Sequence, residues 1–308
     1  MFLVSFLSGC GPRYTYPAGK VPESIEKICR KEYKIDAQAR VAGKTVGALL
    51  LADFRPDSNG QIPKEIHEKM GQVLQAVTRV ALSTDLPLDF CTVVVRDKSQ
   101  GHELVITRSL DDTKRANAEA LGMEESMNRT VFGQGKAAPG TESFALKDIT
   151  LADFLTEQIV QRIRFNFAKE AQGPEEAMPE EAAIQSAVLA DGSFHGTGGL
   201  RTFRFSILSL KSADPKATLL EVFKTANAVL EGYRYRDFDG LEIQDYLNRQ
   251  KLVIDKETLE AYQKKAITAE EIFERYLVES ASIQEVFKLF GFTIPQDSAA
   301  SASASPTP

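Results

Sequence analysis

The second half of this sequence repeats features of the first half at a nearly constant spacing, and no other feature constrains the fold as much. Asp89-Phe90 recurs 148 positions later as Asp237-Phe238 (237 − 89 = 148). The apolar run Leu104-Val105-Ile106 recurs at the same spacing as Leu252-Val253-Ile254. Matches that keep their order at one spacing indicate two related structural units. The length of 308 residues is also typical of two domains rather than one.

The hydrophobic pattern of the first unit predicts a hairpin, a helix and two further strands. Apolar and β-branched runs at residues 39–41 and 46–53 predict the hairpin. Pro63 then opens a helix whose apolar side chains recur at helical spacing. Residues 91–96 and 103–107 predict the two strands, and a helix beginning after Gly122 closes the unit.

The second unit repeats this order of predicted elements. Residues 202–210 predict a strand, and Asp214 caps a helix that has Pro215 at its first position. Paired strands at 240–245 and 251–255 follow, and Thr268 with Glu271 fits the capping box of the closing helix. An amphipathic helix over residues 149–168 matches the short helix around Cys29 as the opening element of its unit.

These elements predict an α+β fold of two tandem related domains, each with an antiparallel sheet covered by helices on one face. The predicted domains span residues 21–140 and 148–294. Within the second, residues 172–185 contain Gly, Pro and four Glu and predict a solvated acidic insertion. Residues 295–308 are almost wholly Ser, Ala and Pro and predict a disordered tail.

Charge and hydropathy argue against a nucleic-acid-binding protein and against a chain whose body spans a membrane. The net charge is −6, with acidic and basic side chains interspersed, which argues against an electrostatic grip on nucleic acid or on anionic lipid headgroups. The body of the chain has no uninterrupted apolar run near the ~18 residues that a membrane-spanning helix needs.

The chain opens with an apolar run followed by Ser8, Gly9 and Cys10, the pattern of a secretory signal with its cleavage site. Leu7-Ser8-Gly9-Cys10 resembles the lipobox of bacterial lipoproteins. The resemblance covers four residues and implies a diacylglycerol on the Cys10 sulfur, with cleavage just before it. Residues 1–9 are then a signal remnant and residues 10–20 a lipid-anchored tether. The alternative is that the opening residues form a short strand or helix packed on the first domain.

The lipobox resemblance also implies a location. Two or more acyl chains hold a protein stably at a membrane, so the mature chain is expected to be membrane-anchored and to face the periplasm or the cell exterior. Gly11 rather than Asp follows the cysteine, which by family behaviour implies the outer membrane where the source has one. The expected partners are the membrane, through the lipid anchor, and proteins of the envelope. No cofactor is expected.

Two cysteines remain after Cys10 is set aside. Cys29 falls on the apolar side of a short predicted helix, and Cys91 begins a predicted strand. An even pair in an oxidising compartment permits a disulfide. Both residues also suit small buried side chains in a core, and the sequence leaves the two alternatives open.

No residues cluster in the way that a metal or catalytic site requires. The three histidines, His67, His102 and His195, stand on separate predicted elements, and no metal site is predicted. The stretch from His195 to Gly199 predicts a glycine-rich turn between two strands, and residues 133–136 predict a loop. The acidic residues between 237 and 245 alternate between faces of a strand and predict a polar outer sheet face.

One motif is a candidate for recognition. Tyr233-Arg234-Tyr235-Arg236 alternates aromatic and cationic side chains, and both types are enriched at binding hot spots. The alternative is that the tyrosines pack on the core while the arginines project into water.

Two functions from different classes fit these features. The favoured one is a lipid-anchored cell-envelope lipoprotein that acts as a binding or scaffolding module, since tandem related domains without converging catalytic groups offer surfaces. The alternative is an envelope hydrolase of glycan or peptide whose acid and base residues assemble only in three dimensions.

Overall fold

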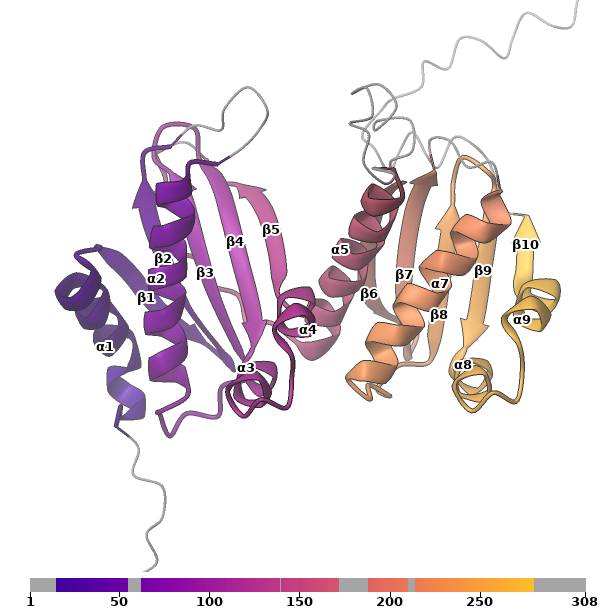
Figure 1. Cartoon of the computed structure of the whole chain (residues 1–308), viewed down its shortest axis with the longest axis horizontal. Coiled ribbons are helices and arrows are strands. Elements are labelled where there is room, and N and C mark those ends of the chain that lie inside the picture. The colour runs from indigo at the N-terminus through magenta and orange to yellow at the C-terminus, as the bar shows by residue number, and fades with distance from the viewer. Residues whose placement is uncertain (1–14, 55–61, 139, 172–187, 210–213, 280–308) are drawn as a thin grey trace, which may run out of the picture. The chain divides into compact units, whose positions relative to one another are not determined.

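The computed structural model describes residues 15–54, 62–138, 140–171, 188–209 and 214–279. The chain divides into two compact units, Met1–Phe154 and Leu155–Pro308, and the division falls inside helix α5, Leu151–Ala171 (Figure 1). Each unit has a five-stranded sheet with helices packed on it. The predicted fold class, two tandem α+β domains, is confirmed.

The first unit begins with two short helical segments, Ala18–Lys20 and the π-helical Cys29–Tyr33, on either side of α1. Its other elements are, in chain order, α1 Val21–Ile28, β1 Ala37–Ala42, β2 Thr45–Ala52, α2 Lys64–Ala81, β3 Phe90–Asp97, β4 His102–Ser109, α3 Leu110–Asn117, α4 Met123–Asn128 and β5 Val131–Lys136.

The second unit has the same order of sheet strands and helices as the first. Its elements after α5 are β6 Val188–Thr197, β7 Leu200–Ser209, α7 Pro215–Gly232, β8 Gly240–Asp245, β9 Gln250–Asp255, α8 Lys256–Gln263, α9 Ala269–Tyr276 and β10 Leu277–Glu279. Asp214 caps α7 through its side chain, and the capping box of Thr268 and Glu271 is present at α9, both as predicted.

Both sheets are mixed, so the prediction of wholly antiparallel sheets was wrong for one strand pair in each unit. The strands lie in the order β1-β2-β3-β4-β5 and β6-β7-β8-β9-β10. The pairs β2–β3 and β7–β8 are parallel, and the other pairs are antiparallel. The reason is the connection, because α2 and α7 each run the length of the sheet and return the chain to the edge where the preceding strand began.

The strand register confirms the internal repeat. Val93 lies opposite Ile106 in the β3–β4 pair, and Leu241 lies opposite Ile254 in the β8–β9 pair. Both residues of each pair are separated from their counterparts by 148 positions (241 − 93 and 254 − 106). The repeat therefore preserves the side-chain contacts across the sheet as well as the order of elements.

Residues 133–136 were predicted as a loop and instead belong to β5, which lies at the edge of the first sheet. Gly133 and Gly135 lie opposite Val105 and Glu103 of β4. Alternating glycines hide a strand from sequence pattern because they carry no apolar side chain to reveal its period.

Helices cover one face of each sheet, as predicted (Figure 1). In the first unit α1 and α2 pack on β1, β2 and β3, and the core between them is built from aliphatic side chains and Cys29 and Cys91. In the second unit Figure 1 shows α5 and α7 on the same side of the sheet. None of the helices within the described ranges is long and apolar enough to cross a membrane.

The opposite face of the first sheet is covered by residues 140–150, called the crossing segment below. Arg96 on β3 donates hydrogen bonds to the carbonyls of Thr141 (2.8 Å) and Ser143 (3.0 Å). Phe144 is 2% exposed and lies with Leu146 over Gly47 of β2. The first unit therefore has three layers: helices, sheet and crossing segment.

Several predicted segments lie outside the described residues, namely Cys10 with the signal remnant, the acidic insertion at 172–185 and the tail at 295–308. The last part of the predicted tether is attached to the first unit. The amides of Thr15 and Tyr16 donate to the carbonyl of Ser83 at 3.0 and 3.1 Å.

Candidate functional site

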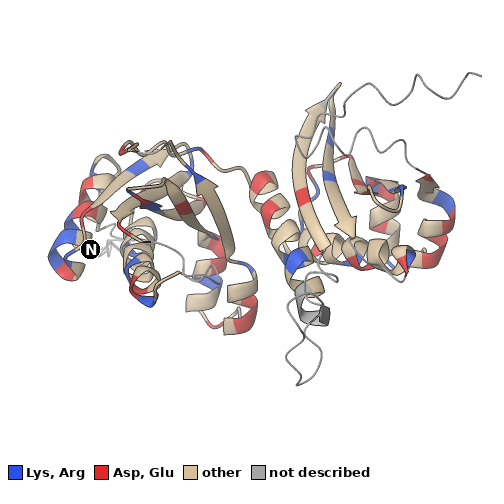
Figure 2. Ribbon diagram, turned by 90° about the horizontal axis from the view of Figure 1, so that it is seen from above, with Lys and Arg blue, Asp and Glu red and all other residues tan. Residues whose placement is uncertain are grey.

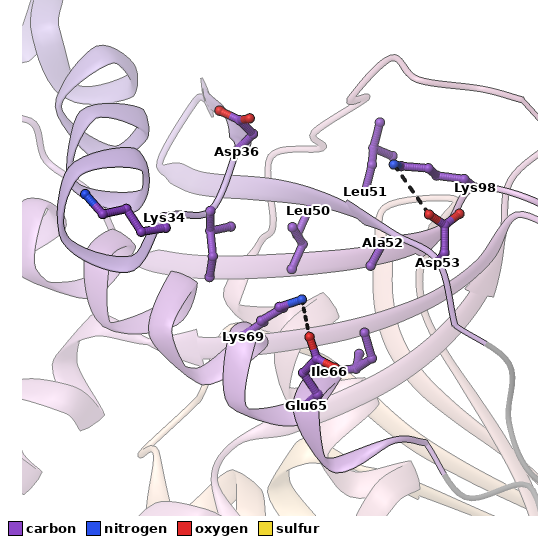
Figure 3. A pocket seen from close by; sticks show the side chains of 11 residues that line it. Lys34, Asp36, Leu50, Leu51, Ala52, Asp53, Glu65, Ile66, Lys69 and Lys98 are labelled. Atoms are coloured by element: carbon purple, nitrogen blue, oxygen red, sulfur yellow. Dashed lines mark hydrogen bonds and ion pairs between the residues drawn. The ribbon is translucent and has the colours of Figure 1, made fainter.

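The first unit has an open pocket of about 420 Å³ at the carboxyl end of β2 (Figure 3). Its floor is apolar and includes Leu50 and Ile66, both buried. Its rim is charged and is formed by Lys34, Asp36, Asp53, Glu65, Lys69 and Lys98. In open sheets with helical crossovers, ligands bind in the crevice outside the carboxyl ends of parallel strands, and this pocket occupies that place next to the β2–α2–β3 crossover.

Four separate parts of the chain supply the rim. Lys34 ends the helical segment before β1 in the left-handed region, with φ of 59°, so the chain turns there and brings Asp36 to the rim. Asp53 follows β2, and Lys98 follows β3, the parallel neighbour of β2. Lys69 comes from the second turn of α2. These charged groups therefore share one rim because the fold brings four separate parts of the chain to the same edge of the sheet.

Two ion pairs join four of the rim charges, whereas Asp36 pairs with Arg30 outside the rim. Lys69 Nζ lies 2.5 Å from Glu65 Oε1, and this ammonium lowers the pKa of the Glu65 carboxyl below its usual range. Lys98 Nζ lies 3.7 Å from Asp53 Oδ2 (Figure 3). Ion pairs between exposed side chains are worth about 0 to 1 kcal/mol, so a ligand that carries both signs of charge can replace them at little cost.

The pocket therefore suits recognition of a ligand with an apolar part and charges of both signs, such as a segment of polypeptide. The lining residues are aliphatic residues, lysines and carboxylates. Within the part of the chain that the structure describes, no group of three or more His, Cys, Asp or Glu side chains is placed to hold a metal ion.

The predicted recognition motif lies in the second unit, directly after α7. Tyr233 and Tyr235 are half-buried, whereas Arg234 and Arg236 are exposed. The Tyr233 hydroxyl accepts a hydrogen bond from Gln158 Nε2 at 3.2 Å. The Tyr235 ring stacks on Phe238 at 6.2 Å between centroids. This placement agrees with the alternative in which the tyrosines pack on the core, and recognition by this motif stays a prediction.

The structure resolves the two alternatives for Cys29 and Cys91. Both side chains are fully buried and both thiols are free, so they act as small core residues. Burial raises the pKa of each thiol to about 11, which keeps them in the unreactive protonated form.

The histidines lie apart, on α2, β4 and β6. His102 Nε2 lies 3.0 Å from Gln100 Oε1, and His195 is exposed. The predicted glycine-rich turn is present as Gly198 and Gly199, which have φ of 61° and 87° between β6 and β7. These positive angles at both positions are those of the tight hairpin turns that glycine favours.

The predicted polar outer face of β8 is carried by Glu242. Its carboxylate lies 2.9 Å from Lys251 Nζ and 3.7 Å from Arg204 Nε on the neighbouring strands. Asp237 and Asp239 instead pair with Arg201 at the start of β7.

The prediction of a polar outer face was wrong for Asp245, which is fully buried at the end of β8. Asp97 is also buried and occupies the equivalent position of the first unit (245 − 97 = 148), a pairing that sequence reasoning did not find. Each ends the strand after a crossover helix and accepts hydrogen bonds from the amides of the turn that follows. Burial acts to raise the pKa of Asp97, but donation by Ser99 Oγ and by the Gln100 and Phe54 amides holds it below its usual range. For Asp245 burial prevails and raises the pKa.

Comparisons with known proteins place the chain in no family. No protein-family model matches it, and no curated protein matches it. Among solved structures, the crystal structure of a sex pheromone staph-cAM373 precursor is similar at 12% sequence identity and a TM-score of 0.18. That alignment covers 69% of this chain and 67% of the other.

Proposed function

We propose that this protein is a lipid-anchored lipoprotein of the cell envelope that acts as a binding or scaffolding module. The observation that carries the proposal is the sequence Leu7-Ser8-Gly9-Cys10, which resembles the lipobox of bacterial lipoproteins. Its partners are the membrane, through the acyl chains on Cys10, and envelope proteins. Where the source has an outer membrane, that membrane is the proposed location.

The pocket of the first unit supports the binding part of the proposal. Its apolar floor can take an aliphatic side chain of a partner, and its rim offers both lysines and carboxylates to the charges beside it. A lipid anchor also confines the protein to a surface, which raises the effective concentration of weak binding sites toward partners on the same surface.

The anchor is tested with Cys10→Ser in the full chain. We expect the wild type to sediment with membranes and the variant to appear in the soluble fraction with an unchanged circular dichroism spectrum. Cys91→Ala is the matched control, because it removes a cysteine from the core and leaves the lipobox intact. Mass spectrometry of the mature wild type that shows an unmodified Cys10, or a variant that still sediments with membranes, refutes the anchor.

The pocket is tested by a charge swap, Glu65→Lys with Lys69→Glu, which keeps an ion pair on α2 and reverses its polarity. We expect this swap to reduce the recovery of envelope proteins after chemical cross-linking and detergent extraction. The matched control is the swap of Lys64 and Glu68, which pair at 3.5 Å one turn apart on the same helix and do not line the pocket. Equal recovery with both swaps contradicts binding at the pocket.

A further inference from the structure

The two sheets open with equivalent hairpins, β1–β2 and β6–β7. The pair next to the turn is Ala42 with Thr45 in the first unit and Thr197 with Leu200 in the second. Residues of the two hairpins therefore correspond at a spacing of 155 (197 − 42 and 200 − 45). At this spacing the strand register of one hairpin can be compared directly with that of the other.

Strand pairing runs further in the second hairpin than in the first. β1 ends at Ala37, which lies opposite Leu50, whereas β6 continues past the corresponding position to Val188, which lies opposite Ser209. β2 itself continues to Ala52, which pairs with β3 alone. Among the described residues, the end of β2 therefore has an unpaired edge at positions that β6 covers in the second unit.

The pocket of the first unit lies at this unpaired edge. Residues 34–36 line one side of it and residues 51–53 line the other (Figure 3). The amide of Ile35 donates to the carbonyl of Cys29 at 3.0 Å, so the end of the preceding helical segment holds the chain at Ile35. The chain before β1 therefore leaves the edge of β2, and the pocket opens between them.

The backbone of Asp53 faces the pocket. The carbonyl of Ala52 accepts a hydrogen bond from the Lys98 amide at 3.1 Å, and the Phe54 amide donates to Asp97 Oδ1 at 3.3 Å. Both neighbours of Asp53 therefore turn these groups toward β3. Successive residues of a strand present their backbone groups to opposite edges, so those of Asp53 point away from β3. In the described part of the chain, neither group has a hydrogen-bond partner.

The second unit shows how a strand lies at this edge. Three residues of β6 lie opposite the counterparts of Phe54, Asp53 and Ala52, namely Val188 opposite Ser209, Leu189 opposite Leu208 and Ala190 opposite Ile207. Leu189 is 50% exposed, whereas Ala190 is 5% exposed. The Ala190 carbonyl accepts a hydrogen bond from Arg164 Nε at 3.1 Å, so its backbone faces away from β7. A strand beside β2 should likewise bury the side chain opposite Ala52.

Side chains at the edge define the segment that fits. Ala52 is smaller than its counterpart Ile207, which leaves room on the pocket floor for an aliphatic side chain. Asp53 lies 3.7 Å from Lys98 on one side, so a second cation can flank it on the other, as two cations flank Glu242 in the second unit. Acidic and basic residues are interspersed along both units (Figure 2), so local pairs of this kind carry charge recognition.

We propose that the pocket binds an extended polypeptide segment of a partner protein as an added antiparallel strand beside Ala52 and Asp53. The inference rests on the proposed binding function of the pocket and adds the form and chemistry of the partner. An aliphatic residue opposite Ala52 fills the floor. The residue before it is basic, lies opposite Asp53 and exchanges two backbone hydrogen bonds with it. In strand addition the main chain supplies affinity and alternate side chains supply specificity.

N-methylated peptides test the added strand and leave the protein unchanged. The probe is acetyl-Thr-Val-Lys-Leu-amide, in which Leu is placed opposite Ala52 and Lys opposite Asp53. An NMR titration of the full chain with Cys10→Ser should show binding at about 1 mM and a shift of the Asp53 amide signal. N-methylation of the peptide Lys, whose amide faces β2, should weaken binding about tenfold or more. N-methylation of the peptide Leu, whose amide faces away, is the matched control and should change binding less than about threefold.

Charge reversal tests the register. Replacing the peptide Lys by Glu should weaken binding to the wild type, and Asp53→Lys should restore it. Asp111→Lys on α3, an exposed site away from the pocket, is the matched control and should not restore it.

Equal binding of both N-methylated peptides, or no binding of the unmodified peptide at about 1 mM, overturns strand addition. An Asp53 signal that shifts when the protein alone is concentrated assigns the edge to a second copy and also overturns it. If envelope proteins are nevertheless lost from the Glu65–Lys69 swap, the pocket still binds its partner in another way, so failure of the added strand is distinguishable from failure of the proposed function.

Discussion

Gly47→Ala should destabilise the first unit, because the crossing segment lies directly over this glycine. A Cβ at this position would lie 2.7 Å from Thr92 Cγ2, 2.9 Å from Leu146 Cδ1 and 3.1 Å from Phe144 Cζ. Real Cβ atoms do not approach other atoms this closely, so at least two side chains must move. Overpacking of a buried site costs about 1 to 3 kcal/mol. Replacing a strand glycine by alanine also stabilises the fold by about 0.5 to 1 kcal/mol, because alanine lowers the conformational entropy of the unfolded chain.

The net loss in the free energy of unfolding is therefore about 1 kcal/mol, between limits of about 0 and 2.5 kcal/mol. Gly133→Ala on β5 is the matched control, because its added Cβ would meet Val105 Cβ at 3.6 Å, an ordinary contact. We expect this control to be neutral or more stable than the wild type. Urea unfolding followed by far-ultraviolet circular dichroism measures both, since the sequence contains no tryptophan for fluorescence.

The double variant Gly47→Ala with Leu146→Ala tests the contact itself. Leu146→Ala removes the atom that the new Cβ would meet at 2.9 Å, so the two substitutions together should cost less than the sum of their separate costs. For side chains in contact we expect a coupling of about 0.5 kcal/mol or more. Strict additivity, or a Gly47→Ala protein that is more stable than the wild type, would refute the packing of residues 140–150 on this sheet.

Three further outcomes follow from buried polar groups and thiols. Arg129 is 8% exposed and lies 3.0 Å from buried Asp112, which Arg115 also approaches at 3.6 Å. Arg129→Leu removes the closer of these two cations and should lower the free energy of unfolding in urea, by less than the about 3 to 5 kcal/mol that the loss of a sole partner costs, and adding Asp112→Leu should restore part of that loss. Because the pKa of Asp97 is lowered in the folded state, Asp97 stabilises the fold above the ordinary pKa of aspartate, and this stabilisation is lost as the pH falls below that value. Because the pKa of Asp245 is raised, Asp245 stabilises the fold at low pH, and this stabilisation is lost as the pH rises through and above the ordinary pKa of aspartate. We therefore measure urea midpoints between about pH 3 and 7. In Asp97→Asn the midpoint should fall less steeply than in the wild type as the pH is lowered. Asp245→Asn should lack the stabilisation that the wild type gains from Asp245 as the pH is lowered. Cys91 in the folded protein should resist a thiol reagent that labels it at once in urea, and rapid labelling of the native chain would contradict its burial.

Much of the fold was predictable because the repeat and the apolar periodicities act locally. The helix after Pro63 and the hairpin before it follow from side chains spaced at 3.6 and 2 residues, and the structure contains both. The parallel pairing of β2 with β3 was missed because the path of the connecting chain fixes the relative direction of the strands. The residues of the strands themselves do not show that direction. The crossing segment has no periodic pattern, and its one signal was Gly47 within an apolar strand.

The pocket was beyond sequence reasoning for a different reason. Each rim residue is an ordinary surface charge in its own element, and only the β2–α2–β3 crossover brings Asp53 and Lys98 together. The lipobox resemblance, in contrast, rests on four adjacent residues, so the sequence alone is enough to suggest it.

The repeat shows that two charged rim positions of the pocket are not charged in the second unit. The amide of Lys98 donates to the carbonyl of Ala52, and the amide of Tyr246 donates in the same way to Ile207, so Tyr246 occupies the position of Lys98. By the same register Leu208 occupies the position of Asp53. Tyr246 and Leu208 are 8% and 9% exposed, so these two charged rim positions of the first unit are occupied by buried, uncharged side chains in the second. Because duplication preserved the core register and not these charges, the two units present different surfaces, and a partner that binds the pocket should be lost from the Glu65–Lys69 swap whatever is done to the second unit.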